Sequence, residues 1–281
     1  MKNIIKLSLA SLLATSLYAG EFQIGTGTME LNGGFTGLNT SKKDDVLTYS
    51  LVEQHKNMFS SSWFYKYNFT WYDSNEIVNG QESQNSTVVP SIDYRPQGLD
   101  LNLVLGKDLS RTDENNYVGA GIMLGVSLPW IDSKKDSNNN DSTSDNAMNA
   151  MEKSKTEMLT YKIGPSITAR KSLNKYFTVY GSATYAYQTG NLKNSYAKVD
   201  TNVDGIFQEY DAGIRFQPVS SDYDMGWITL SPRLYATMGY RYTSWELNDV
   251  AIDVTGTNTT FNKSDLTMTS SVVYFGAGYS F

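Results

Sequence analysis

The stretch from Trp63 to Trp71 constrains the fold most, because aromatic and polar residues alternate along it without a break. Successive side chains of a β-strand point to opposite faces, so an alternation with a period of two places each kind of residue on its own face. A water-soluble sandwich has no need of such a row of aromatic residues opposite lysine and asparagine. The stretch therefore predicts a strand with an aromatic face toward lipid and a polar face away from it. The aromatic face carries Trp63, Tyr65, Tyr67, Phe69 and Trp71, and the polar face carries Lys66, Asn68 and Thr70.

The same alternation recurs along most of the chain and predicts about eleven strands. Short polar turns are predicted at Gln54–Asn57, at Lys171–Lys175, and at Pro96–Gly98, where Pro restricts φ and Gly permits positive φ. The pattern stops in two longer polar stretches, 131–156 and 246–265, which we expect to be loops. The predicted strands occupy 22–35, 46–53, 63–71, 88–95, 99–105, 118–130, 159–170, 177–188, 206–216, 228–242 and 271–281.

The composition excludes several classes of protein. The chain has 281 residues, no cysteine and a formal net charge of -6, and its mean hydropathy is -0.39. Without cysteine, a disulfide framework and a thiolate-bound metal are excluded. The acidic balance argues against a general nucleic-acid-binding protein, which needs a basic face. No internal stretch approaches the roughly 18 apolar residues of a membrane-spanning helix, whereas spanning strands escape that test because only alternate residues face lipid.

The first nineteen residues have the pattern of a secretory signal peptide. Lys2 and Lys6 form a positive region, Leu7 to Leu17 form a short apolar region, and small residues follow. Cleavage is predicted after Ala19, and the adjacent residues contain no cysteine that could carry a lipid anchor. The predicted division is therefore a signal peptide at 1–19 and a mature chain at 20–281.

The last eleven residues carry a resemblance to a known family. From Ser271 onward, apolar or aromatic residues alternate with small or polar ones, and the chain ends on an aromatic residue. This pattern resembles the C-terminal signature strand of Gram-negative outer-membrane β-barrel proteins. The resemblance implies location in the outer membrane after export through the periplasm, and recognition of the terminal strand by the barrel-assembly machinery. The residues assigned to that assembly signal are Phe275, Tyr279 and Phe281.

The predicted fold is all-β, an antiparallel transmembrane β-barrel. Bacterial single-chain barrels have even numbers of strands, with short periplasmic turns and long outer loops. Eleven is an odd number and therefore conflicts with that rule. Turns and loops can be assigned to the two sides of the membrane from either terminus, and the two assignments differ by one strand somewhere between about residues 107 and 160. A barrel of about twelve strands is the prediction, with ten and fourteen as alternatives.

Charged residues on the polar faces are the candidate functional residues. Facing lipid, each Lys or Arg near the midplane would cost roughly 2–4 kcal/mol, so these residues are predicted to face the lumen. Two interpretations stay open: they neutralise one another and fill the interior, or they form a charged constriction that selects a solute. The candidates are Lys162, Arg170, Glu209, Asp211, Arg215, Arg233 and Arg241.

Three functions are compatible with these patterns. The first is a narrow porin-like pore for small solutes or ions, the second a closed structural or adhesive barrel acting through its outer loops, and the third an outer-membrane hydrolase. The third is disfavoured, and the chain is predicted not to be an enzyme, because its single histidine, His55, lies in a predicted turn without a matching nucleophile.

No metal or cofactor is expected. Asp136, Asn138 and Asn140 have the spacing of a calcium loop, but Asp141 and Ala147 stand where that loop needs glycine and glutamate. The partners implied are outer-membrane lipid, lipopolysaccharide, the assembly machinery and small solutes, with no nucleic acid.

Overall fold

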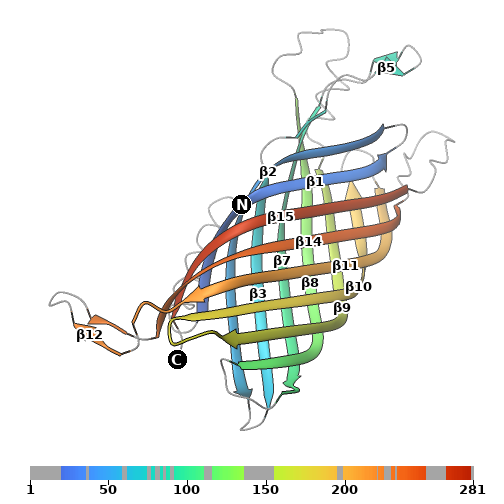
Figure 1. Ribbon diagram of the computed structural model, residues 1–281. Helices are drawn as coiled ribbons and strands as arrows, with labels where there is room; N and C mark the ends of the chain where they lie inside the picture. Colours follow the sequence, from blue (N-terminus) through green and yellow to red (C-terminus); the bar gives the residue numbers. More distant parts are fainter. Residues whose placement is uncertain are drawn as a thin grey trace.

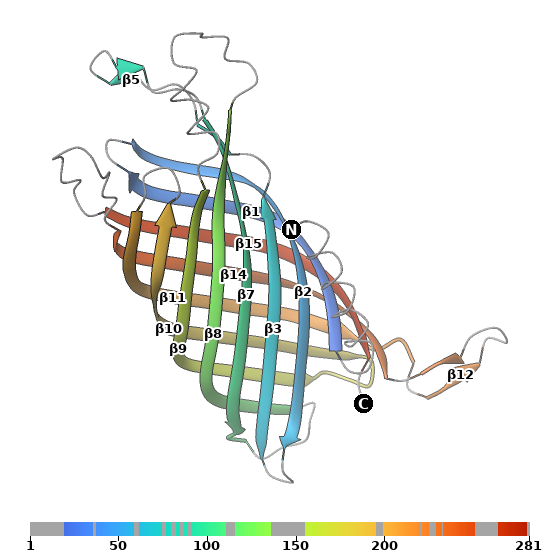
Figure 2. The same cartoon turned by 180° about the vertical axis from the view of Figure 1, so that it is seen from behind.

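The main sheet curls round until its first and last strands pair, which gives a closed antiparallel barrel of ten strands (Figures 1 and 2). In a computed structural model, the described residues are 20–35, 38–58, 62–74, 77–79, 83–84, 87–88, 92–110, 116–135, 155–194, 199–219, 221–224, 229–231, 233–250 and 264–279. The barrel strands are β1 (Gly20–Phe35), β2 (Leu38–Met58), β3 (Trp63–Ser74), β7 (Ile92–Asp108), β8 (Asn116–Lys135), β9 (Lys155–Ser172), β10 (Phe177–Asn194), β11 (Val199–Phe216), β14 (Leu234–Val250) and β15 (Ser264–Tyr279).

The ring is complete because the first and last barrel strands pair with each other and because β3 pairs with β7 across the short strands between them. β1 pairs with β15 from Gly20–Tyr279 to Gly33–Leu266, and β3 pairs with β7 from Trp63–Lys107 to Asp73–Gln97. Both ends of the described chain therefore lie at one end of the barrel, which we call the terminal end. The opposite end, where β1 leads into β2 and β14 into β15, is the loop end.

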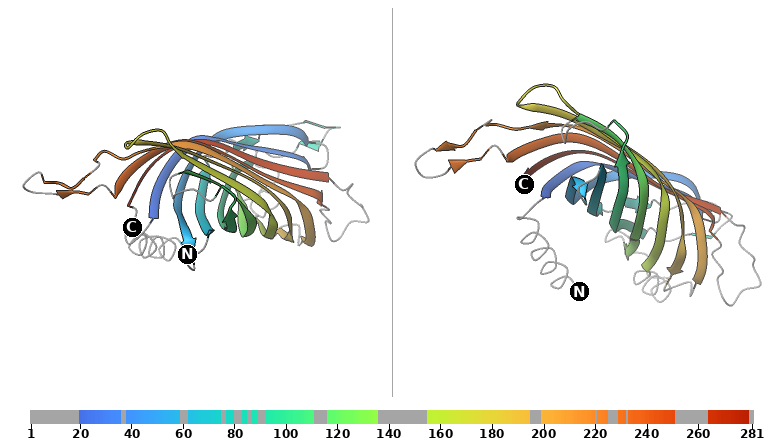
Figure 3. Two further views of the ribbon diagram at one scale, coloured as in Figure 1. Left: turned by 60° about the horizontal axis from the view of Figure 1, so that its bottom comes forward. Right: turned by 90° about the horizontal axis from the view of Figure 1, so that it is seen from below.

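Five short strands lie outside the ring of ten. β4 (Ile77–Asn79) extends the edge of β7, and β5 (Ser83–Gln84) pairs with β6 (Thr87–Val88). β12 (Tyr223–Asp224) pairs with β13 (Thr229–Leu230), and this pair projects from the terminal end, away from the wall (Figure 3). No helix among these described segments is long and apolar enough to cross a bilayer.

The prediction of twelve strands is wrong, and the alternative of ten is correct. The sequence prediction counted one strand too many at Pro96–Gly98, because β7 continues through the turn predicted there. The error did not lie between residues 107 and 160. Pro96 is tolerated because the β3–β7 ladder ends at Asp73–Gln97 and the β4–β7 ladder begins at Ile77–Tyr94. The Pro96 carbonyl points to that side, where it accepts a hydrogen bond from Ser74 Oγ at 2.5 Å. Because the amide position of a strand residue points to the same side as its carbonyl, the missing N–H falls in the gap between the ladders.

Strand ends also differ from the sequence prediction. β2 continues through the predicted Gln54–Asn57 turn, and residues at both ends of the two long predicted loops belong to strands. Strands of 17 to 20 residues, such as β14 and β8, exceed the 9–11 residues that a tilted transmembrane strand needs. The additional length lies mostly at the loop end.

Near the terminal end, the outer face is apolar and the inner face is polar. On β11, Ile214 and Tyr210 point outward and are about half exposed, whereas Glu209 and Asp211 point inward and are buried. Neighbouring strands show the same division, which is the one expected of a wall between lipid and a polar interior. We call this outward band the apolar belt; its exposed members include Ile24, Trp63, Leu101, Leu103, Leu105, Val118, Ile122, Leu124, Tyr161, Ile163, Ile167, Tyr185, Tyr187, Tyr210, Ile214, Met238, Tyr240, Val273 and Phe275.

Toward the loop end, the polarity of the two faces reverses. On the same strand, Phe207 and Val203 point inward and are buried, whereas Asp200, Asn202 and Asp204 point outward. An apolar interior with a polar exterior is the arrangement of a water-soluble β-barrel. We call this part of the barrel the extension. Each long strand thus joins a segment suited to lipid to a segment suited to water.

Candidate functional site

A fully buried arginine organises the middle of the barrel. Arg241 Nη2 lies 3.0 Å from Asp211 Oδ2, and the two side chains are only 2% and 4% exposed. Arg241 also donates hydrogen bonds to Gln23 Oε1 at 2.8 Å, Ser50 Oγ at 2.9 Å and Thr70 Oγ1 at 3.3 Å. These partners lie on β1, β2, β3 and β11, so one side chain on β14 ties together strands around the barrel.

A second ion pair lies beside the first. Lys162 Nζ pairs with Asp100, and the same ammonium group lies 3.7 Å from the centre of the Phe207 ring. Asp100 also accepts hydrogen bonds from Ser127 and, at 2.7 Å, from Asn102. Both charged side chains are at most 1% exposed. A buried pair of this kind is stable only when further hydrogen bonds satisfy the carboxylate, as they do here.

Glu209 connects the two ion pairs. Its carboxylate accepts hydrogen bonds from Asn68 at 3.4 Å and from Asn102 at 3.5 Å. On the other side, Asp211 accepts a hydrogen bond from the Tyr274 hydroxyl at 2.6 Å. We call the resulting arrangement the central network. Its charged members are Asp100, Lys162, Glu209, Asp211 and Arg241.

The interior between the central network and the loop end is filled by apolar side chains. Trp245 packs edge-on against Tyr72, with ring centres 5.2 Å apart, and its Nε1 donates a hydrogen bond to Ser127 Oγ at 3.0 Å. The network and the apolar packing are therefore in contact. The packed residues are Met29, Val46, Phe64, Tyr72, Val104, Met123, Ala186, Phe207, Trp245, Met268 and Val272, and beyond them Met158, Leu192, Val203, Leu247 and Leu266. Of these, Phe64, Val104 and Met123 extend the packing past the network toward the terminal end, where Phe64 lies beside Tyr117.

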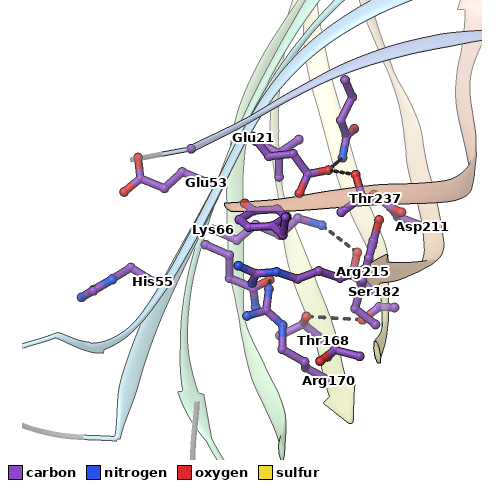
Figure 4. A pocket seen from close by; sticks show the side chains of 18 of the residues that line it. Glu21, Glu53, His55, Lys66, Thr168, Arg170, Ser182, Asp211, Arg215 and Thr237 are labelled. Atoms are coloured by element: carbon purple, nitrogen blue, oxygen red, sulfur yellow. Dashed lines mark hydrogen bonds between the residues drawn. The ribbon is translucent and has the colours of Figure 1, made fainter. Parts of the chain in front are cut away.

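The interior between the central network and the terminal end holds a polar cavity of about 380 Å³ (Figure 4). Asp211 and Lys66 lie at its inner end, and Gly20, Gln217 and Tyr279 lie near the ends of their strands. The lining also includes Glu21, Gln54, Arg170, Tyr180, Ser182, Arg215, Arg233, Tyr235 and Thr237. The cavity thus ends at the network and does not run through the barrel.

The seven charged residues that the sequence singled out fall into two groups. Lys162, Glu209, Asp211 and Arg241 belong to the central network, whereas Arg170, Arg215 and Arg233 line the cavity. Arg233, which precedes β14, is exposed, and the other six lie on strands. The structure therefore divides the single predicted set between two sites.

Sequence reasoning missed several residues of these sites. Glu21 lines the cavity, and its position between outward-facing residues of β1 was the signal that could have assigned it to the interior. Gln23, Ser50 and Thr70 bind Arg241 but carry no charge, so a search for charged residues passed over them. Trp245 lies in the interior because the polarity of the faces reverses, whereas alternation alone placed aromatic residues toward lipid.

The residues assigned to the assembly signal lie on β15. Phe275 points outward and is 60% exposed, within the apolar belt. Tyr279 lies at the terminal end, opposite Gly20 on β1 and Leu234 on β14. Phe281 lies outside the described residues, as do the signal peptide at 1–19 and the calcium-like spacing at 136–147.

His55 and possible metal ligands are the remaining candidates that the sequence raised. His55 lies on β2, is exposed, and has its ring centre 5.9 Å from that of Tyr65. His55 and Glu53 both contribute to the lining of the cavity, and Figure 4 shows their side chains on the other side of β2 from the two arginines. Within the described part of the chain, no group of three or more His, Asp or Glu side chains could hold a metal ion.

Comparisons with known proteins agree with the geometry at the level of the architecture. No family model matches the chain, and no curated protein matches it. Among solved structures, the outer-membrane protease OmpT of Escherichia coli is 9% identical over 95% of this chain and 98% of its own, with a TM-score of 0.49. The translocator domain of autotransporter NalP from Neisseria meningitidis is 10% identical over 100% of this chain and 95% of its own (TM-score 0.38). The toluene transporter TbuX of Ralstonia pickettii is 8% identical over 93% of this chain and 90% of its own (TM-score 0.35).

The closed antiparallel barrel, its apolar belt and its polar inner face define the barrel fold that Gram-negative outer-membrane proteins have, as the terminal strand predicted. One expectation from the sequence needs correction. The prediction that the chain is not an enzyme is wrong as an exclusion, since one of the similar barrels is a protease and the fold does not establish the function of this chain. The physical error was to equate one histidine with the absence of acid–base groups, since carboxylates also serve in that role and a fold does not decide the chemistry it carries.

Proposed function

We propose that this chain is a closed outer-membrane barrel that acts at its loop end and conducts no solutes. The observation that carries the proposal is the filled interior: Arg241 and Trp245, which belong to the central network and the adjoining apolar packing, are 2% and 4% exposed. Barrels of about eight strands are just wide enough to be filled by side chains, whereas those of 16–18 strands leave a channel. Ten strands lie close to the lower limit.

The energetics favour a permanently filled interior. Opening a path past Arg241 would separate it from Asp211 and leave two charges without their partners, which costs about 3–5 kcal/mol for a buried pair. Beyond that pair, a solute would have to displace Trp245 and the apolar side chains packed against it. A narrow pore, the first function considered from the sequence, requires both changes.

The extension supports a role at the loop end. Its outward residues, such as Asp200 and Asn202, suit water, and its inward residues form a core of their own. A barrel that merely sealed the membrane would not need strands that continue past the apolar belt. We infer that the extension holds the loop end away from the membrane surface, where it serves as a structural or adhesive platform.

The proposal includes a route to the membrane. Residues 1–19 direct export and are removed, the terminal end faces the periplasm, and the assembly machinery recognises Phe275, Tyr279 and Phe281. Outer-membrane lipid and lipopolysaccharide then contact the apolar belt. Mass spectrometry of the protein isolated from outer membranes tests the first step: the expected N-terminus is Gly20, and an intact Met1 would contradict it.

Conductance decides between the closed barrel and the pore. The folded protein, identified by its altered gel mobility before heating and by circular dichroism, is inserted into planar bilayers, and protease protection in matched liposomes confirms insertion. No discrete current steps are expected in potassium chloride or potassium acetate. Reproducible steps that change with the ion would refute the closed barrel and restore the selective pore.

A cellular experiment tests the role of the loop end. The protein is expressed in a Gram-negative host, and both the uptake of a small impermeant dye and the binding of the cells to one another and to surfaces are measured. The closed platform predicts unchanged dye uptake and increased binding. Increased uptake without a change in binding would contradict it.

A further inference from the structure

Two arginines meet in the cavity at the terminal end, and neither has a salt-bridge partner among the described residues. Arg170 on β9 lies opposite Tyr180 on β10, and Arg215 on β11 lies opposite Thr178, which is also on β10. Their stems therefore flank β10 on its two sides, and Figure 4 shows both guanidinium groups directed into the cavity. Like charges placed together in this way repel one another unless an anion lies between them.

The hydrogen bonding of both arginines is incomplete. Arg170 Nη2 donates to Gln54 Oε1 at a long 3.4 Å, and the carbon centre of the Arg215 guanidinium lies 3.4 Å from the centre of the Tyr235 ring. The Nε atoms of both side chains are buried, and neither makes a hydrogen bond within the described part of the chain. Buried polar groups in folded proteins are rarely left in that state.

The carboxylates around the cavity are engaged elsewhere. Asp211 binds Arg241 and the Tyr274 hydroxyl. Glu21 lies close enough to attract the Arg215 guanidinium, but its carboxylate already accepts hydrogen bonds from Gln23 at 2.6 Å and from Thr237. Glu53 also contributes to the lining, and its carboxylate accepts a hydrogen bond from the Tyr65 hydroxyl. A further cation, Lys66, reaches the inner end of the cavity, where it donates to Ser182 Oγ at 2.8 Å. The positive charges facing the cavity thus exceed the carboxylates free to balance them.

We propose that this cavity binds a phosphate-bearing small molecule that enters from the terminal end. The planar guanidinium group presents paired N–H donors that match two oxygens of a phosphate, and two such groups can hold one anion from two sides. Tyr180 and Ser182 add hydroxyl groups to the same lining. A volume of about 380 Å³ lies within the range of small-molecule sites, and the cavity ends at the central network, so the ligand is held and not passed through.

The proposed site is separate from the function proposed for the loop end, and it is tested without reference to conductance. The folded barrel in a zwitterionic detergent is titrated calorimetrically with sodium pyrophosphate and with glycerol 3-phosphate, at constant ionic strength maintained with sodium chloride. Saturable binding of one molecule per barrel is expected for at least one of the two. Stronger binding of pyrophosphate indicates a free phosphate compound, and stronger binding of glycerol 3-phosphate indicates a lipid headgroup.

Matched variants locate the binding. Arg170→Gln and Arg215→Gln together should weaken binding by at least tenfold, whereas Arg95→Gln, on the outer face beside Asp73, should leave it unchanged. Arg215→Lys keeps the positive charge but removes the paired N–H donors of the guanidinium, so this variant should bind the phosphate compound at an intermediate strength. Absence of saturable binding to the wild-type protein would overturn the proposal on its own, as would equal binding by the double glutamine variant. Because the wild-type result is decisive, a folding defect in a variant cannot hide the answer.

Discussion

Replacing Arg241 with methionine should destabilise the barrel strongly, because it leaves a buried carboxylate without its partner. The arginine makes five hydrogen bonds, two of them to Asp211. Most neutral acceptors keep other contacts, since Ser50 and Thr70 still share a hydrogen bond at 2.9 Å. The loss therefore falls mainly on Asp211, whose remaining hydrogen bond within the described part of the chain comes from the Tyr274 hydroxyl. Removal of one partner from a buried pair costs about 3–5 kcal/mol.

The assay is reversible unfolding in urea, with the barrel reconstituted in lipid vesicles and followed by tryptophan fluorescence. Arg241→Met should lower the free energy of unfolding by about 3–5 kcal/mol. Asp211→Asn added to that variant should recover part of the loss, because the unpaired charge disappears. Arg95→Met serves as the control, since the Arg95–Asp73 pair is 31% and 27% exposed and such pairs contribute at most about 1 kcal/mol.

Two results would refute this reasoning. A loss below about 1 kcal/mol for Arg241→Met would mean that water reaches Asp211 and that the interior is not closed at this level. Strictly additive effects of Arg241→Met and Asp211→Asn would show that the two side chains do not interact, since neighbours in one network normally deviate from additivity by at least about 0.5 kcal/mol.

Three further predictions concern the wall of the barrel. Gly27→Ala at the β1–β15 seam should reduce the fraction of heat-modifiable barrel on gels, because the added Cβ would lie 1.9 Å from the Ser271 carbonyl oxygen, whereas Gly181→Ala meets its nearest atom at 3.3 Å and should fold normally. Ile163→Arg in the apolar belt should cost roughly 2–4 kcal/mol in vesicle unfolding, but Asn202→Arg in the extension should cost almost nothing; equal costs would place the belt elsewhere. Phe281→Ala should lower the amount of barrel assembled in cells without slowing refolding of the purified protein in detergent, and an equal defect in both would count against an assembly signal.

The alternation of residues contained more of the fold than the turn signals did. Trp63 to Trp71 predicted the orientation of β3 correctly, because side-chain direction in a strand depends only on sequence parity. The strand count was wrong because Pro96 and Gly98 look the same in a turn and in a strand whose neighbouring ladder is interrupted. That interruption involves β3 and β4 and cannot be seen in the residues around Pro96 alone.

The sequence by itself determined that this is an antiparallel barrel with polar and apolar faces, and that residues such as Arg241 and Arg215 point inward. Only the tertiary structure decided that the interior is closed, that Arg241 binds Gln23 from 218 positions away, and that Arg215 belongs to a separate cavity. The physical reason is that contacts across a barrel depend on how many strands close it and on their register. Both are properties of the whole ring, whereas the direction of a side chain is a property of its own strand.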